Sequence, residues 1–358
     1  MRHSAVLRAF AMLILLAPAA CAQPAPLAAD LLGTAPLPAS TQDQAGQPVT
    51  ITGLSGITWL GPSPGVGAAA QTDDYVAVMD NSSVLVRLRV TIATGGTAIQ
   101  EVRVLGAVRF DQVRDWEAIA PGPRAGTVLL AEEGTPSVAL LDPATGQIAW
   151  SAPAPPPFQN RRANRGFESL ASSPASGIAW AANEEALTTD GPAASPSGTT
   201  VVRLVRWRVS PAGARPDRQH AYVVDRMPGP TVPGGSSGLA ELVLLADGRL
   251  LALERSLSLT PGLFRSKLYE VNLDGATNVA RFGTLAGASY TAASKRLLWE
   301  GSVQNLEGLC AGPRLRDGRT LLVGVVDDGD PVSVNTLVVL SLRGVGPGQT
   351  SAVRATSD

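Results

Sequence analysis

The sequence predicts an all-β protein whose body is a β-propeller of four-stranded blades, with five blades favoured and six as the alternative. Three observations support this fold. A short box recurs five times, at intervals of 51 to 70 residues. Each copy is followed by a β-rich run that ends in an acidic residue, which indicates one supersecondary unit repeated along the chain. No long segment has the periodicity of an amphipathic helix.

Each box ends in a small residue followed by Ile or Leu, and its copies lie at 54–57, 116–119, 167–170, 236–239 and 306–309. The β-rich runs lie at 75–80, 128–133, 178–184, 250–254 and 321–327. Turn sequences such as Asp247-Gly248 and Asp317-Gly318 separate box from run, as a hairpin requires. We therefore expect each box to begin the innermost strand of a blade and each run to form the second strand.

Two further strands complete most of the predicted units. They lie at 137–141 and 147–150 in the second unit and at 201–209 and 220–224 in the third. In the fourth unit, the strand at 267–272 is followed by Asp274-Gly275 and another short strand. The fifth unit lacks a clear outer strand. We expect residues 47–53 to supply it, because such closure would remove the open edge of an incomplete ring.

The N-terminus has the pattern of an export signal. Arg2 and Arg8 flank the start of an apolar run at 9–17, and small residues precede Gln23. We expect a signal peptide at 1–22, or a lipoprotein leader acylated at Cys21, then an Ala/Pro-rich arm at 23–46, the propeller domain at 47–345 and a tail at 346–358. No later segment approaches the roughly 18 apolar residues of a membrane span. The protein is thus expected to be exported, periplasmic or secreted, or anchored to the outer membrane by a lipid on Cys21.

Composition excludes several classes of protein. The net charge is −1, which does not suggest a nucleic-acid binder. After removal of the leader the chain keeps one histidine, His220, and one cysteine, Cys310, too few for a standard zinc, haem or iron–sulfur site. Residues 234–238 match the G-x-S-x-G string, but the expected strand, elbow and helix are missing and no histidine follows. We expect His220 to be a surface or packing residue on an outer strand.

Acidic residues recur at one register in successive units, which is unusual because burying an unpaired carboxylate is costly. If each box begins an innermost strand, Glu117, Glu168 and Glu307 converge at one end of the central channel. The acids that end the next strands are expected near the same mouth; they are Glu132, Glu184, Glu254 and Asp327. Crowded carboxylates need cations or hydrogen-bond donors. The pattern therefore predicts a Ca²⁺ site with the ligands Glu117, Glu168, Glu254, Glu307 and Asp327.

Four arginines accompany these acids in the sequence: Arg114, Arg162, Arg165 and Arg255. Each could pair with a carboxylate or hold an anionic substrate. In the structural alternative, the repeated acids lock neighbouring blades by accepting hydrogen bonds from backbone N–H groups. The acidic turn at 327–330 could hold Ca²⁺ on its own, although such turns are common on protein surfaces.

The boxes resemble those of the phytase-like domain family, which is also called "esterase-like activity of phytase". The matching stretches are 115–120, 164–171, 237–242, 248–256 and 305–309. The resemblance implies an exported bacterial propeller and, through distant likeness to Ca²⁺-dependent propeller phytases, a metal-assisted phosphoesterase. The residues of this chain that match the family's boxes, and that the resemblance implies as candidate site residues, are Glu117, Glu168, Glu254, Arg255 and Glu307. The acidic signature strings of true propeller phytases are absent, and only Lys267 and Lys295 are lysines, which leaves the substrate open.

Three functions are compatible with these residues. In the first, a Ca²⁺-assisted phosphoesterase or esterase-like hydrolase of the cell envelope, the carboxylates of Glu117, Glu168 and Glu307 are catalytic. The arginines then bind a small anionic or ester substrate. The second is a non-catalytic propeller that binds a ligand or a partner, which an aromatic content of 4% disfavours. The third is a Ca²⁺-dependent lactonase-like hydrolase, for which Asn183 and Asn305 would supply ligands. In each case we expect a monomer.

Overall fold

The computed structural model describes residues 25–64, 70–93, 95–260, 262–330 and 332–346. The predicted leader at 1–22, with Cys21, and the predicted tail beyond residue 346 lie outside these described residues. A single turn of 3-10 helix, η1 (Pro156–Asn160), is the one helical element of the described part, and every other regular element is a strand. None of the described residues form a helix long and apolar enough to cross a membrane.

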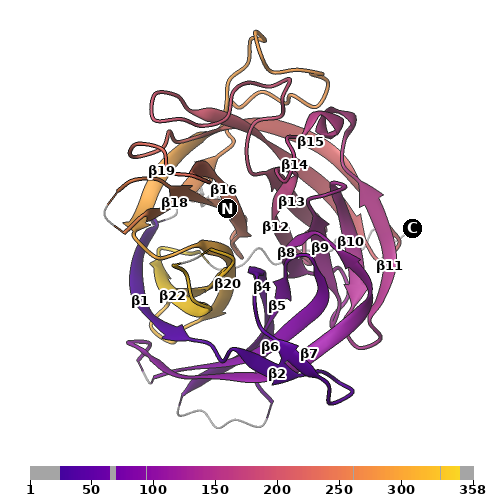
Figure 1. The fold of residues 1–358 in the computed structure, drawn as a ribbon, viewed down its shortest axis with the longest axis vertical. Helices are drawn as coiled ribbons and strands as arrows, with labels where there is room; N and C mark the ends of the chain where they lie inside the picture. Colours follow the sequence, from indigo (N-terminus) through magenta and orange to yellow (C-terminus); the bar gives the residue numbers. More distant parts are fainter. Residues whose placement is uncertain (1–24, 65–69, 94, 261, 331, 347–358) are drawn as a thin grey trace, which may run out of the picture.

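Five four-stranded antiparallel sheets are arranged as the blades of a ring (Figure 1). Blade 1 contains β4 (Leu54–Pro62), β5 (Gln71–Met79), β6 (Ser82–Ile92) and β7 (Ile99–Arg114). Blade 2 contains β8 (Trp116–Pro121), β9 (Val128–Glu132), β10 (Ser137–Asp142) and β11 (Gln147–Pro153). Blade 3 contains β12 (Phe167–Ser173), β13 (Ile178–Asn183), β14 (Thr200–Ser210) and β15 (Gly213–Val224). Blade 4 contains β16 (Ser236–Leu244), β17 (Leu250–Leu257), β18 (Phe264–Asn272) and β19 (Ser294–Gly301).

Blade 5 joins the two ends of the described chain. Its strands are β20 (Leu306–Arg314), β21 (Thr320–Val326), β22 (Thr336–Arg343) and, outermost, β1 (Ala28–Pro36). The innermost strands β4, β8, β12, β16 and β20 contact one another in a closed circle. The fold is therefore the predicted β-propeller, with five blades.

The strand that closes the ring differs from the prediction. Residues 47–53 do not supply it, because β3 (Pro48–Thr50) pairs with β2 (Ser40–Gln42) in a separate hairpin. Instead β1 pairs antiparallel with β22, with Ala28 opposite Arg343 (Figure 1, indigo beside yellow). This strand lies within the segment that composition marked as an arm. Its Ala-rich sequence is a weak strand signal, yet Leu27 and Ala29 are buried.

Blade 4 also departs from the expected connection. Its outer strand β19 does not directly follow Asp274-Gly275, because residues 273–293 leave the blade and pack on blade 3. The N–H of Val279 donates to Gln219 O, and the N–H of Ala293 donates to Ala221 O, both at 2.8 Å. The apolar side chains of this segment cover β15, which is why a tight hairpin does not form here.

The small residue of each box lies where the innermost strands approach most closely. A Cβ on Gly56 would lie 2.9 Å from the Cα of Ala118 in the next blade. A Cβ on Gly308 would lie 2.8 Å from the Cα of Gly56. These distances are shorter than carbon–carbon contact allows, so at these two positions the strands can approach this closely only because the residue is glycine.

Candidate functional site

A β-bulge orients the repeated polar residues. In β4, β8, β12 and β20 the pairing register skips the second residue of the strand, which is Ser55, Glu117, Glu168 and Glu307 respectively. A bulged residue leaves the ladder and its side chain is re-aimed. The blade-to-blade repeat therefore places these side chains at one end of the channel, which we call the mouth.

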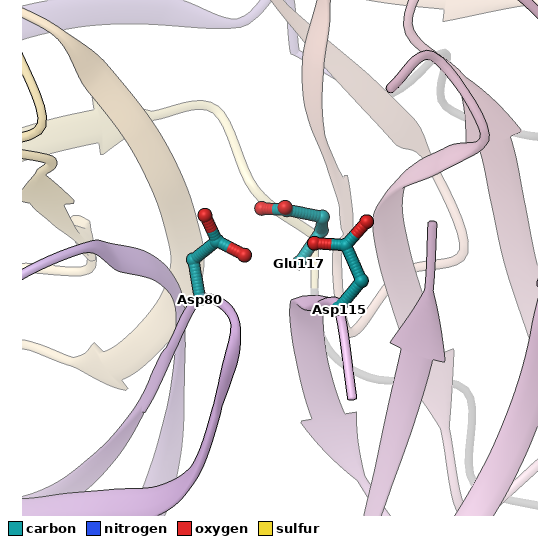
Figure 2. Close-up of side chains that lie close together, drawn as sticks. All are labelled: Asp80, Asp115 and Glu117. Atoms are coloured by element: carbon teal, nitrogen blue, oxygen red, sulfur yellow. The ribbon is translucent and has the colours of Figure 1, made fainter. Parts of the chain in front are cut away.

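Seven carboxylates meet at the mouth, in three overlapping groups. Within each group, one oxygen from every residue lies within 4.8 Å of the others. The groups are Glu117, Glu168 and Glu307; Asp80, Asp115 and Glu117; and Glu133, Glu168 and Glu184. Figure 2 shows the second group: Asp80 extends across the mouth toward Asp115 and Glu117. Because the groups share Glu117 and Glu168, they form one continuous acidic cluster, called the mouth cluster below.

Three residues of the mouth cluster were missed as site residues by sequence reasoning: Asp80, Asp115 and Glu133. The position of these residues relative to the strands could have identified two of them. Asp80, Glu133 and Glu184 each come directly after the second strand of their blade. The residue before Glu133, Glu132, belongs to the strand itself and points elsewhere, where its Oε2 accepts hydrogen bonds from Ser137 and Arg114. The site position is thus the first residue beyond the second strand.

Burial and mutual repulsion raise the pKa of most of these carboxyl groups. Burial first, then the nearby Glu184, raises the pKa of Glu133 to about 8. Burial also raises the pKa of Glu307 to about 8, against the opposing effect of Arg255. Burial followed by neighbouring carboxylates raises the pKa of Glu117 and Glu168 well above the ordinary range. Burial and Asp80 raise the pKa of Asp115 to about 6.

Two arginines enter the mouth cluster. Nη2 of Arg255 lies 3.2 Å from Oε1 of both Glu184 and Glu307, and 3.9 Å from Oε1 of Glu168. Nη1 of Arg165 lies 2.8 Å from Oε2 of Glu184. Two guanidinium groups cannot neutralise seven carboxylates, so the cluster must bind protons or a further cation.

Blade 4 contributes a cation in place of an acid. Its box carries Ser237 where three other blades have glutamate, and Arg255 pairs with the next residue, Gly238, across the β16–β17 ladder. A Cβ on Gly238 would lie 2.4 Å from Cγ of Glu184. This glycine therefore leaves the space that the Glu184 side chain occupies beside Arg255.

The structure does not bring Glu254 to the mouth cluster. Glu254 and Arg255 are consecutive in β17, so their side chains point to opposite faces of the sheet. Glu254 faces blade 3, where its Oε1 accepts a hydrogen bond from the Tyr222 hydroxyl at 2.6 Å and its Oε2 accepts one from the Asp225 N–H at 2.9 Å. The prediction that the acid at the end of each β-rich run faces the mouth is therefore wrong by one residue in this blade: Arg255, the residue after Glu254, faces the mouth.

Arg114 also lies away from the mouth cluster. Its Nη1 donates to Glu132 at 3.0 Å, and its guanidinium lies 5.5 Å from the centre of the Trp116 ring. Arg162 donates to the carbonyl oxygens of Ala186 and Gly191. Of the four arginines predicted from the sequence, Arg165 and Arg255 form ion pairs with the mouth carboxylates.

Asp327 lies at the edge of the mouth cluster. Nδ2 of Asn305 donates to both Asp327 Oδ2 and Glu307 Oε1, each at 3.1 Å, and so connects the two acids. The other acids of the 327–330 turn have structural partners: Asp328 accepts from the Gly53 N–H, and Asp330 accepts from the N–H groups of Val332 and Ser333.

Other polar residues singled out in the sequence lie elsewhere. Oδ1 of Asn183 accepts the Arg203 N–H, so this amide does not serve the mouth. The ring of His220 packs against Trp180 and contacts Thr277 O through Nδ1. Deeper in the channel, Glu241 was not predicted. Its Oε1 accepts the N–H groups of Leu170 and Leu242, and burial raises its pKa well above the ordinary range.

The opposite end of the channel is apolar. A cavity of about 50 Å³ there is lined by residues of all five innermost strands, including Thr58, Ile119, Leu170, Leu242 and Leu309. The described lining of this cavity contains no charged residue, in contrast to the mouth. A ligand that recognises this channel by charge would approach from the mouth.

The mouth cluster fits a hard divalent cation. All its potential ligand atoms are carboxylate oxygens, which Ca²⁺ prefers. Buried Glu133 Oε2 and Asp115 Oδ1 have no hydrogen-bond partner among the described residues. Unpartnered buried oxygens are costly, and a bound cation would satisfy them.

Comparison with known proteins identifies a family. A family model described as "Phytase-like: Esterase-like activity of phytase" matches residues 50–329. No curated protein matches the chain.

Solved structures resemble the chain only distantly. U3-55K is 8% identical, with 87% of this chain and 98% of that chain covered and a TM-score of 0.35. A luciferin-regenerating enzyme is 12% identical, with 83% and 94% covered and a TM-score of 0.35. The hydrazine synthase of Kuenenia stuttgartiensis is 13% identical with a TM-score of 0.33; the similarity covers 81% of this chain and 63% of the synthase chain, less than two thirds of its length.

Proposed function

The chain belongs to the phytase-like family described by "esterase-like activity of phytase", and from this premise we propose that it is a Ca²⁺-assisted hydrolase of phosphoric or related esters. The observation that carries the proposal is the meeting of Glu117, Glu168 and Glu307, from three blades, within 4.8 Å. Equivalent positions of the sequence repeats are brought to one point, and this point is rich in the carboxylate oxygens that a hard cation prefers.

The residues that would hold Ca²⁺ are the members of the mouth cluster other than Asp115, with Asp327 at the edge. Bound Ca²⁺ would offset the negative charge of a phosphoric ester and polarise its phosphorus–oxygen bonds. Arg255 and Arg165 would hold the anionic part of the substrate, since their side chains are 12% and 29% exposed and lie against the same carboxylates.

Asp115 has the properties of a general base. Its pKa of about 6 lies close to neutral pH, where a base is both ionised and able to take a proton. It is only partly buried, and Oδ1 has no hydrogen-bond partner among the described residues. In this proposal Asp115 accepts a proton from the attacking water, while Glu117 beside it remains a ligand.

The experiment is hydrolysis of p-nitrophenyl phosphate and p-nitrophenyl acetate by the purified chain, with added Ca²⁺ and with a chelator. We expect Ca²⁺-dependent turnover of the phosphate ester, and its loss in Glu117→Gln and Asp115→Asn. Glu101→Gln, an exposed acid on β7, is the matched control and keeps wild-type turnover. Equal background rates in Ca²⁺ and chelator would rule out the hydrolase.

A structural cation is the second candidate, and one observation favours it. Glu133 and Glu184 are each 1% exposed, which suits a buried ion that joins blades 2 and 3 better than one open to substrate. This would be a non-catalytic, ligand-binding propeller. A chelator would then lower the melting temperature of a protein that hydrolyses neither ester.

We also propose that the protein works outside the cytoplasm. The support is the leader pattern of the sequence, with its charged start, apolar run and small residues before Gln23. Cell fractionation of the full-length chain tests this, and a Cys21→Ser variant distinguishes a lipid anchor from a cleaved signal peptide.

A further inference from the structure

A second candidate site lies between blades 1 and 2, at the end of the channel away from the mouth. It is a cavity of about 620 Å³, called the base cavity here, bordered by the distal ends of β4 and β8 and by the β8–β9 loop. This volume falls in the range of roughly 300–1,000 Å³ that is usual for small-molecule sites. The base cavity shares no residue with the mouth cluster.

Unequal strand lengths create this cavity. In blade 1, β5 and β6 have 9 and 11 residues, whereas β8 and β9 of blade 2 have 6 and 5. The shorter blade cannot cover the whole facing sheet. At the floor of the cavity Val76 and Leu85 of blade 1 pack against Val128 of blade 2, and each of the three is at most 2% exposed.

The walls of the base cavity are mainly apolar. Val76, Leu85 and Val108 line it from blade 1, and Val128 and Pro121 line it from blade 2. Trp59 and Leu60 complete the wall at the end of β4, where Leu60 is 44% exposed. Nε1 of Trp59 donates to Asp73 Oδ1 at 3.0 Å, which fixes the indole in place.

Two arginines give the base cavity its charge. Arg87 of β6 and Arg124 of the β8–β9 loop line it, and its described lining contains no Asp or Glu. Neither guanidinium forms a hydrogen bond or ion pair within the part of the chain that the structure describes. Asp74, which interacts electrostatically with Arg87, is held by Arg89 through two hydrogen bonds of 2.7 and 2.9 Å.

We propose that the base cavity binds a small amphipathic anion: an apolar chain or ring with one carboxylate-like end. The apolar body would lie against Trp59, Leu60 and Val108, which keep accessible surface in the lining. The anionic end would meet the guanidinium groups of Arg87 and Arg124, which have no hydrogen-bond or ion-pair partner among the described residues. An unpaired arginine at the edge of an apolar pocket selects an anion over a neutral molecule of the same shape.

Isothermal titration calorimetry of the full chain tests this, with decanoate as the probe and decanol and decyltrimethylammonium as matched neutral and cationic ligands. We expect decanoate to bind at micromolar to millimolar concentration and at least about tenfold more tightly than the other two, because charge-assisted hydrogen bonds are the strong ones. No decanoate binding, or equal binding of all three ligands, would overturn the proposal.

Variants locate the binding. Arg124→Gln is the most specific change, because Arg87 also borders a neighbouring hollow beneath the β2–β3 hairpin. We expect Arg124→Gln to weaken decanoate binding about tenfold, and Ala144→Trp, at an exposed position of the lining, to abolish it by filling the space. Arg103→Gln, an exposed arginine of β7 outside the cavity, is the control and should bind as the wild type does. Equal loss in Arg103→Gln and Arg124→Gln would place the anion elsewhere and refute the proposal.

Discussion

Arg255 of blade 4 and Glu307 of blade 5 form an ion pair across a blade boundary, with 3.2 Å between Nη2 and Oε1. The same Nη2 lies 3.2 Å from Glu184 of blade 3. One buried guanidinium therefore links three blades at the mouth. It also lowers the pKa of Glu307, which burial would otherwise raise further.

Replacing Arg255 by Gln should destabilise the protein in a pH-dependent way. At pH 8, close to its pKa, Glu307 is partly ionised and loses its cation. Removing one partner of a buried ion pair typically costs about 3–5 kcal/mol when the other stays charged. Near pH 5 the raised pKa of Glu168 and Glu307 keeps them protonated, so less is lost. Urea unfolding at both pH values measures this. An equal loss at pH 5 and pH 8 would show that Arg255 acts through packing alone.

Without metal, stability should fall as the pH rises from about 5 to about 8. The pKa of Glu133 and of Glu307 is raised from an ordinary value of 4.5 to about 8, so between these limits the folded protein holds protons that the unfolded chain has lost. Stability then decreases with pH. Chemical unfolding in chelator at several pH values checks this, and Glu307→Gln should flatten the dependence. A stability that rises over this interval would contradict the raised pKa values.

Removing one mouth carboxylate should weaken Ca²⁺ binding strongly. Glu168 belongs to two of the three groups, so Glu168→Gln removes a ligand from both. We expect an affinity at least about tenfold lower by calorimetry, since even residues behind the ligands change metal affinity by about that factor. The exposed Glu101 provides the control, and its Gln variant should bind normally. Unchanged affinity in Glu168→Gln would remove this residue from the ligand set.

Adding a methyl group at Gly56 should disturb the closure of the ring. The new Cβ would meet the Cα of Ala118 at 2.9 Å, and backbone cannot move aside cheaply. We expect Gly56→Ala to cost about 1–3 kcal/mol of unfolding free energy. Gly283→Ala, where a Cβ meets nothing within 4 Å, should cost much less. Thermal unfolding of the two variants compares them directly, and equal melting temperatures would argue against the close approach.

Deleting the chain through Pro36 should expose the edge of β22, which β1 covers. A bare strand edge promotes aggregation, and the buried Leu27 and Ala29 are lost as well. Deletion through residue 24 leaves β1 intact and serves as the control. Light scattering during heating should show earlier aggregation for the longer deletion only. If both deletions behave alike, β1 does not stabilise the ring.

The repeat made the fold predictable because it sets strand positions directly. The boxes fall on the innermost strands, and their glutamates meet at the mouth as equivalent positions of a ring must. The strand that closes the ring was not predictable in the same way. β1 follows no repeat, and its Ala-rich sequence becomes a strand only because β22 offers an unpaired edge.

The errors in the site have a geometric origin. A strand reverses its side-chain direction at every residue, so a register error of one residue moves an acid from the mouth to the opposite face. This explains why Glu254 faces Tyr222 and Lys295, whereas Arg255 faces the mouth. Asp80, Asp115 and Glu133 lie just outside strands. There the alternation of a strand no longer predicts to which side a side chain points.

Ca²⁺ titration calorimetry of the wild-type chain at pH 7, in two buffers with different ionisation enthalpies, tests whether the mouth cluster is a Ca²⁺ site. Carboxyl groups whose pKa is raised to about 8 must lose protons when they bind a cation. The account predicts saturable Ca²⁺ binding with net proton release, both reduced in Glu168→Gln. Heats that show no Ca²⁺ binding at millimolar concentration, or binding without proton release, would contradict it.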